Sequence, residues 1–123
     1  TLYFNLGVVN AQRGNKEEAS KYYRKTIELD PNFESGYLNL VTLILEGENT
    51  IVEEMNGLGT SRADNARYDE LKIERENIYK ECVPILEKLI EIGKNEEAIK
   101  TLMNIYGTLG NNEGYMKMKE MMQ

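Results

Sequence analysis

Large and small residues at fixed spacings between residues 3 and 31 constrain the fold more than any other feature of this chain. The set consists of Tyr3, Leu6, Gly7, Gly14, Ala19, Tyr23 and Pro31. Gly7 and Ala19 offer small surfaces where two helices can approach closely, and the large residues fill the space between them. Gly14 suits a turn and Pro31 a helix end, because glycine tolerates left-handed backbone and proline cannot continue a helix. The stretch predicts two antiparallel helices.

These residues and their spacings resemble the tetratricopeptide repeat (TPR), a helical hairpin of about 34 residues. The resemblance implies an all-α fold: an α-α superhelix of six helices in three antiparallel pairs. Neighbouring repeats in such a stack bury apolar faces that no single repeat can bury alone. We expect one domain over residues 1–123, with repeat one at 1–33, repeat two at 34–94 and repeat three at 95–123.

The first helix should run from Leu2 to Arg13, with Gly14 ending it. Asn15 suits an N-cap for the second helix, and Glu18 three residues later completes the pattern of a capping box. The second helix should then continue to Leu29, just before the proline.

Repeat two starts in register but departs from the pattern. Tyr37 and Leu40 stand 34 residues after their counterparts in repeat one, while Val41 replaces the small glycine. A turn is expected at Gly47, and residues 48–56 then show a helical pattern of their own before a glycine-rich turn at 57–60. We expect an insertion at about residues 47–75.

A long helix should follow, capped by Ser61 or Asp64 and ending near Ile92. Its apolar residues recur at alternating steps of three and four: Tyr68, Leu71, Ile78, Cys82, Ile85, Leu89 and Ile92. A helix of about 28 residues spans roughly 42 Å, so repeat two should project as a long helical hairpin. Pro84 should remove one backbone hydrogen bond and kink this helix. Arg75 interrupts the apolar seam, and its replacement by leucine is expected to strengthen the seam.

The start of repeat three can be placed in two ways. The stretch from Gly93 to Ala98 echoes residues 14–19, which would put Gly93 inside a repeat. Counting the expected helices places Gly93 between repeats two and three. We favour this placement because Leu102, Tyr106 and the Asn111 cap then fit a repeat's first helix and turn. The final helix should cover residues 113–122.

Composition excludes several classes of function. The net charge is −6 and the basic residues are scattered, which argues against nucleic-acid binding, and no apolar run is long enough for membrane insertion. The chain has no histidine, so the usual hydrolase triads and most zinc sites are absent. Its single cysteine, Cys82, lies on an apolar stripe and is expected to be a buried structural thiol. We therefore expect no enzyme activity, catalytic residue, cofactor or metal.

The resemblance implies a protein–protein interaction scaffold that binds a peptide or protein partner in a concave groove lined by the first helices. The candidate groove residues are Phe4, Asn5, Val8 and Gln12 in repeat one, Leu38, Asn39 and Thr42 in repeat two, and Lys100, Thr101 and Asn104 in repeat three. The apolar members of this set would favour an apolar or amphipathic segment.

The best-known site of the family is a carboxylate clamp made by lysine and asparagine one turn apart. Lys100 and Asn104 match that pattern, whereas Phe4 and Val8 stand at the corresponding positions of repeat one. We therefore do not expect the clamp.

Two other functions are compatible with the sequence: an architectural module that forms a homo-oligomer, and a regulatory module of a larger protein. Thr1 falls inside the first repeat and is not an initiator methionine, so we expect a fragment of a longer protein. A targeting signal cannot be read from such a fragment.

Overall fold

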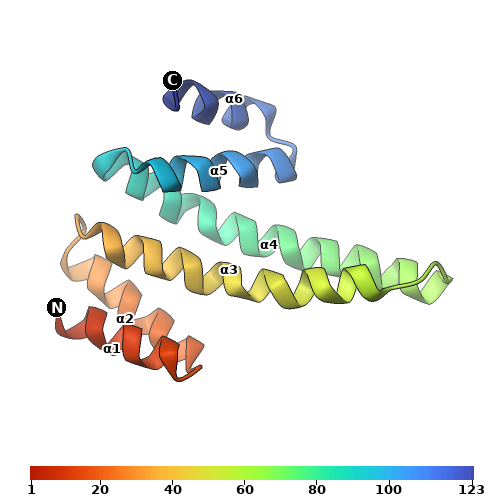
Figure 1. Ribbon diagram of the computed structural model, residues 1–123, viewed down its shortest axis with the longest axis horizontal. Helices are drawn as coiled ribbons and strands as arrows, with labels where there is room; N and C mark the ends of the chain where they lie inside the picture. The colour runs from red at the N-terminus through yellow and green to blue at the C-terminus, as the bar shows by residue number, and fades with distance from the viewer.

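A computed structural model describes all residues from 1 to 123, and it is built entirely from helices and their connections (Figure 1). The helices are α1 (Leu2–Gln12), α2 (Lys16–Leu29), α3 (Glu34–Gly57), α4 (Arg62–Gly93), α5 (Glu96–Leu109) and α6 (Asn112–Met121). The predicted all-α fold with six helices is confirmed.

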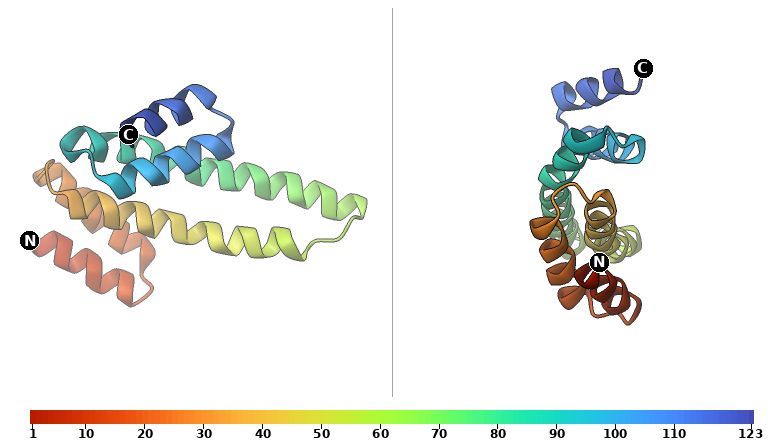
Figure 2. Two further views of the ribbon diagram at one scale, coloured as in Figure 1. Left: turned by 45° about the horizontal axis from the view of Figure 1, so that its top comes forward. Right: turned by 90° about the vertical axis from the view of Figure 1, so that its left-hand side faces the viewer.

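Each helix packs against the next one in the chain, which produces three antiparallel pairs that stack in order. The pairs are α1 with α2, α3 with α4 and α5 with α6, while α2 against α3 and α4 against α5 join neighbouring pairs. The two chain termini lie at opposite ends of the stack, and α3 and α4 extend beyond the other helices (Figures 1 and 2). No helix is both long and apolar enough to cross a membrane.

The close approach predicted between α1 and α2 centres on Gly7 and Tyr23. A Cβ atom placed on Gly7 would come within 2.5 Å of the Tyr23 ring, so only glycine fits without a shift. Ala19 is fully buried beside this contact, and Tyr3 stacks on Tyr22 with ring centroids 6.3 Å apart. Gly14 turns the chain with a φ of 79°, a left-handed conformation that suits glycine. The spacing of the first repeat is thus a packing requirement.

The predicted capping box at the start of α2 is wrong. The Asn15 side chain makes no cap to the helix, and its Nδ2 instead donates to Asn10 Oδ1 at 3.3 Å. Asn95 and Asn111 do cap their helices, since their side-chain oxygens accept from backbone N–H groups three residues later at 3.0 and 2.9 Å. Asn15 has an alternative partner at the end of α1, which the local sequence pattern did not show.

The turn predicted at Gly47 is also wrong, because α3 continues without a break to Gly57. A glycine inside a helix costs only about 1 kcal/mol. The bare backbone at Gly47 lies close to α4, since a Cβ added to this glycine would lie 3.5 Å from the Cδ1 atom of Ile78. Ser61, rather than Asp64, caps the following helix, and its Oγ accepts from the Asp64 N–H at 3.0 Å.

The second pair therefore forms a long helical hairpin, as predicted, but with longer helices. α4 has 32 residues, which corresponds to roughly 48 Å of helix. Its seam toward the neighbouring helices includes Leu71 and Cys82, both almost fully buried. Tyr68 was predicted to lie in the seam and is 45% exposed, whereas Tyr79 was missed and is buried. Pro84 is exposed, and the helix continues through it.

Two hydrophobic clusters form the core. The smaller cluster joins α1 and α2 to α3 and consists of Ala19, Tyr23, Leu40 and Leu43. The larger cluster joins α3 to α6 and consists of Tyr37, Val41, Tyr79, Cys82, Leu86, Leu89, Ile90, Ala98, Ile99, Leu102, Ile105 and Met118. Because α3 contributes to both clusters, it links the first pair to the rest of the stack.

Substitution of Gly7 tests the contact with Tyr23. Gly7→Ala should lower the free energy of unfolding by about 1–2 kcal/mol, because overpacking costs more than the gain in helix propensity returns. Gly57→Ala is the matched control, since Gly57 also lies in a helix but an added Cβ would meet nothing within 4 Å. Urea unfolding should therefore show a loss for the first variant and none for the second; equal stabilities would refute the packing role.

Burial controls the chemistry of Cys82. Desolvation, followed by the nearby carboxylates of Glu81 and Glu48, raises the pKa of its thiol to about 12. Since only the thiolate attacks alkylating reagents, the native thiol should be unreactive at pH 8 and become reactive on unfolding. Iodoacetamide labelling followed by mass spectrometry, with and without denaturant, measures this difference. Rapid labelling of the native protein would contradict it.

Candidate functional site

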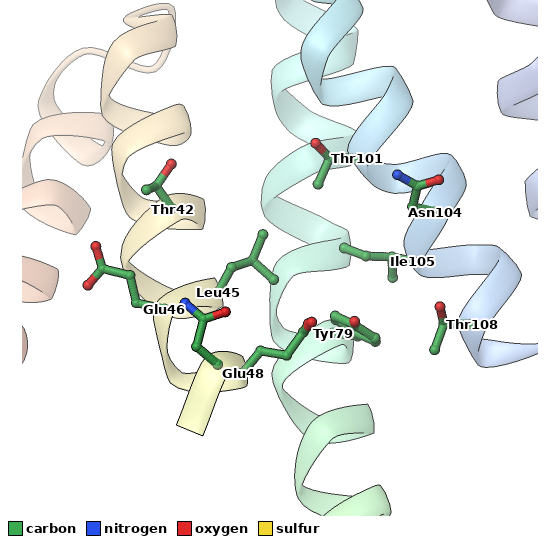
Figure 3. A pocket seen from close by; sticks show the side chains of 10 residues that line it. Thr42, Leu45, Glu46, Glu48, Tyr79, Thr101, Asn104, Ile105 and Thr108 are labelled. Carbon is green, nitrogen blue, oxygen red and sulfur yellow. The ribbon is translucent and has the colours of Figure 1, made fainter. Parts of the chain in front are cut away.

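The largest hollow on the surface lies between α3 and α5, with Tyr79 of α4 reaching into it from behind (Figure 3). Its volume is about 400 Å³. Its lining residues are Thr42, Leu45, Glu46, Glu48, Asn49, Tyr79, Thr101, Asn104, Ile105 and Thr108. Most of these side chains are polar, and none is a lysine or an arginine.

Helical periodicity explains why these residues share one surface. On α3, Leu45 and Glu46 lie three and four residues after Thr42, and Asn49 lies four and three residues after them. On α5, Asn104, Ile105 and Thr108 follow Thr101 with the same spacing. Leu45 and Ile105 supply apolar surface, while hydroxyl and amide groups surround it. α3 and α5 are the first helices of adjacent pairs, and they expose complementary rows across the hollow.

A second, smaller hollow of about 180 Å³ lies on the other side of α3. It is lined by Ala11, Tyr23, Asn39, Thr42, Leu43 and Glu46. Thr42 and Glu46 belong to both hollows, so the two form one recessed surface that crosses α3 from the α1–α2 pair to α5. We call this surface the groove.

A polar cluster supports the groove where it meets the hairpin. Arg75 Nη2 lies 3.7 Å from Glu48 Oε1, and the guanidinium carbon lies 5.4 Å from the centroid of the Tyr79 ring. The Nε atom of Arg75 is buried without a hydrogen-bond partner. Burial, and next the Glu48 carboxylate, raise the pKa of the Tyr79 hydroxyl. The sequence predicted that leucine in place of Arg75 would strengthen the seam. Because Arg75 contacts two groove residues, the structure favours the opposite outcome.

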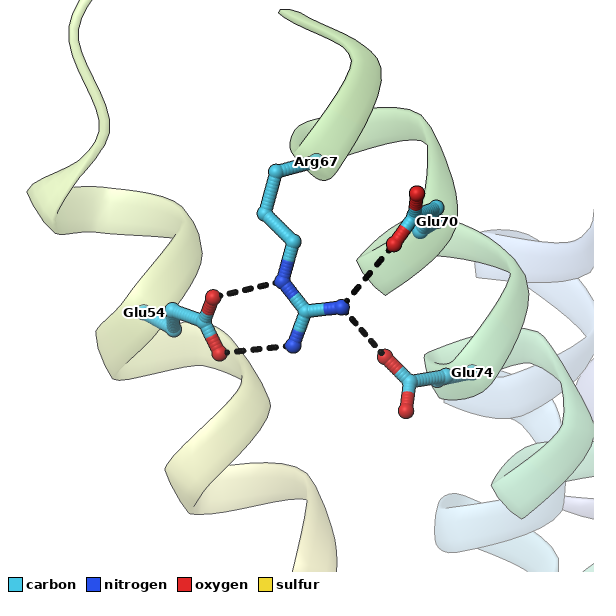
Figure 4. A network of polar contacts seen from close by, with 4 residues as sticks. All are labelled: Glu54, Arg67, Glu70 and Glu74. Carbon is cyan, nitrogen blue, oxygen red and sulfur yellow. Dashed lines mark hydrogen bonds and ion pairs between the residues drawn. The ribbon is translucent and has the colours of Figure 1, made fainter. Parts of the chain in front are cut away.

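A second ionic cluster joins the two helices near the tip of the hairpin (Figure 4). Arg67 on α4 binds both carboxylate oxygens of Glu54 on α3, at 2.7 and 3.0 Å. Glu70 and Glu74 approach the same guanidinium at 3.1 and 3.8 Å. The hydrogen bond from Arg67 lowers the pKa of the Glu54 carboxyl. This paired geometry fixes the register of the two helices beyond the main body.

Three predicted groove residues are partly buried, contact other parts of the protein and line neither hollow. The Phe4 ring meets Phe33 edge-on at 5.0 Å and Tyr23 at 5.9 Å between centroids. Val8 packs with Phe4 on the smaller cluster, and Leu38 packs on the larger one. These side chains contact the protein's own core with part of their surface, and their contact with a partner stays a prediction.

Other predicted groove residues divide between the groove and the open surface. Thr42 and Asn104 face the larger hollow from opposite helices, and Asn39 lines the smaller one. Lys100 lies 3.4 Å from Glu96 in an exposed ion pair. Asn5 and Gln12 are exposed on α1 and line neither hollow. Partner contact by any of these residues stays a prediction.

Sequence reasoning missed several groove residues that lie on the same helical faces as the predicted ones. Leu45, Glu46 and Asn49 continue the Thr42 face of α3, and Thr108 continues the Asn104 face of α5. The mistaken turn at Gly47 explains why Asn49 was missed, because that residue follows the turn. No group of three histidine, cysteine, aspartate or glutamate side chains is placed to hold a metal ion.

Residues 1–33 match the family model of the tetratricopeptide repeat. The first helix pair, with its Gly7–Tyr23 contact and its turn at Gly14, is therefore a tetratricopeptide repeat. Repeats of this family generally mediate protein–protein interactions. No curated protein matches the chain.

Arg75 offers a test of the polar cluster. Arg75→Leu should destabilise the protein by about 1 kcal/mol, because Glu48 is then left part-buried without a cation. Arg75→Leu combined with Glu48→Leu should recover much of that loss, since an apolar pair leaves no charge unpaired. Urea unfolding of the two single variants and the double variant gives the coupling energy between them. Additive losses would mean that the two side chains do not interact.

Proposed function

We propose that the chain is a non-catalytic interaction scaffold that binds an extended segment of a protein partner in the groove. The observation that supports this proposal is the open hollow between α3 and α5, with opposing polar rows around an apolar floor. The tetratricopeptide repeat at residues 1–33 supports the same class of function, because such repeats generally mediate protein–protein interactions.

The side chains around the hollow suit the backbone of an extended peptide. Asn49 and Asn104 each carry an amide that can both donate and accept, and Thr42, Thr101 and Thr108 carry hydroxyls with the same capacity. An extended segment exposes unpaired N–H and C=O groups along its length. Leu45 and Ile105 provide a place for one apolar side chain of the segment.

A second candidate function is self-association through the projecting hairpin. Tyr68 and Ile73 of α4 are 45% and 58% exposed, which leaves two large apolar side chains on the outside of the hairpin. Exposed apolar side chains often mark contact surfaces. The observation is weaker than the groove, because only two large residues are involved and their spacing of five residues places them about 140° apart around α4.

Selection from a random peptide library, followed by a groove-blocking variant, tests the main proposal. Asn104→Trp places a large ring in the hollow and should reduce binding of the selected peptides at least tenfold. Asn77→Trp is the matched control: Asn77 is exposed on α4 and lines neither hollow, so the same substitution there should leave binding unchanged. Titration of labelled peptides by fluorescence anisotropy gives the dissociation constants.

Peptides whose affinity is equal for both variants would refute the groove as the binding site. A molecular mass that rises with protein concentration, and falls to that of a monomer in a Tyr68→Lys/Ile73→Lys variant, would favour self-association instead.

A further inference from the structure

The charged side chains that line the groove are all carboxylates, and each has one cationic neighbour outside the lining. Glu46 and Glu48 are the only ionisable carboxylates that line either hollow, and no lysine or arginine lines them. The row from α5 is uncharged, since Thr101, Asn104 and Thr108 carry hydroxyl and amide groups. Glu46 is the more available of the two carboxylates, because its side chain is 48% exposed and that of Glu48 is 22% exposed.

The acidic face continues along α3 beyond the hollows. Thr42, Glu46, Asn49 and Glu53 follow one another at steps of four, three and four, so they lie along one side of the helix. Glu53 is exposed and makes no ion pair. Seven residues of helix separate the two glutamates by roughly 10 Å. Three residues of a segment in the polyproline II conformation span a similar distance, about 9 Å, and residues three positions apart then lie on the same side of the segment.

The present partner of Glu46 is easily displaced. Lys16 Nζ lies 3.6 Å from Glu46 Oε2, with the two side chains 56% and 48% exposed. Ion pairs this exposed are weak, because water and salt screen them. A cation from a bound segment could therefore replace Lys16 at little cost. In Figure 3 the Glu46 side chain points away from α5, toward the smaller hollow, where such a cation would approach it.

We propose that the groove selects a basic segment of a protein partner, with lysine or arginine residues three positions apart that pair with Glu46 and Glu53. This inference rests on the proposed function and adds the chemistry of the ligand to it. Complementary charge would raise the association rate and disfavour acidic segments, because their carboxylates would lie against Glu46 and Glu53. A carboxylate clamp would require the opposite charge: Lys100 is paired with Glu96 and lies outside both hollows.

The peptides selected from the random library provide the first readout. Those that lose binding to Asn104→Trp should carry pairs of lysine or arginine three positions apart, and their affinity should fall as salt is raised. Groove-dependent peptides that are neutral or acidic would overturn the charge inference and leave the proposed function standing. A library that yields no groove-dependent peptide would overturn both.

Charge variants of the protein give the second readout. Glu46→Gln/Glu53→Gln should weaken a selected basic peptide roughly 4- to 25-fold at low salt, at about two- to fivefold for each exposed ion pair. Lys16→Gln should tighten it about twofold, because the competing cation is removed.

Glu113→Gln/Glu120→Gln is the matched control for these variants, since it changes the net charge equally on α6 and removes no ion pair. The control should change affinity less than twofold. Equal weakening by the control and by the groove variant would mean that net charge, and not these two glutamates, attracts the peptide. Circular dichroism of each variant verifies that the helices are retained.

Discussion

The packing of α4 against α3 on one side and α5 on the other holds the molecule together. The buried stripe of α4 supplies Cys82, Leu86 and Leu89 to a core that extends from α3 to α6. Because no helix pair in such a stack buries its own apolar face, loss of this helix would expose both neighbours. The same packing creates the larger hollow, since α4 lies behind α3 and α5 and fills the space between them with Tyr79. Stability and the candidate binding surface thus depend on one helix.

Polar contacts set the register of the hairpin where the apolar seam is thin. Arg75 contacts Glu48 and the Tyr79 ring where the hairpin leaves the main body. Near the tip of the hairpin, Arg67 donates from two guanidinium nitrogens to the carboxylate of Glu54. The buried Leu71 lies between these two clusters along α4. Bidentate pairing of arginine with a carboxylate is strongly directional, so it specifies position more than it adds stability. The cluster around Arg75 shares Glu48 and Tyr79 with the groove. It therefore connects the geometry of the hairpin to the candidate binding surface.

The groove differs in chemistry from the one that the tetratricopeptide resemblance first suggested. Phe4, Val8 and Leu38 were predicted to offer apolar contacts to a partner, and these partly buried side chains also pack against the protein's own core. The larger hollow itself is lined mainly by hydroxyls, amides and carboxylates along α3 and α5. Such a surface can pair with the backbone of an extended segment and discriminate by charge, whereas an apolar groove would discriminate by the shape of buried side chains. The ligand chemistry that we infer follows from this difference.

Local rules in the amino-acid sequence were enough to predict the helical class, the first repeat and the long hairpin. Gly7 and Gly14 meet steric requirements, Asn95 and Asn111 cap helices, and the apolar seam of α4 has a helical period. The path of α3 through Gly47 depended instead on three-dimensional packing. The stabilisation from packing against α4 exceeds the small free-energy cost of one glycine inside a helix. Packing also left only some residues of each helical face free to form the groove. Periodicity shows that residues share a face, but contacts between distant helices decide whether the protein's own core occupies that face.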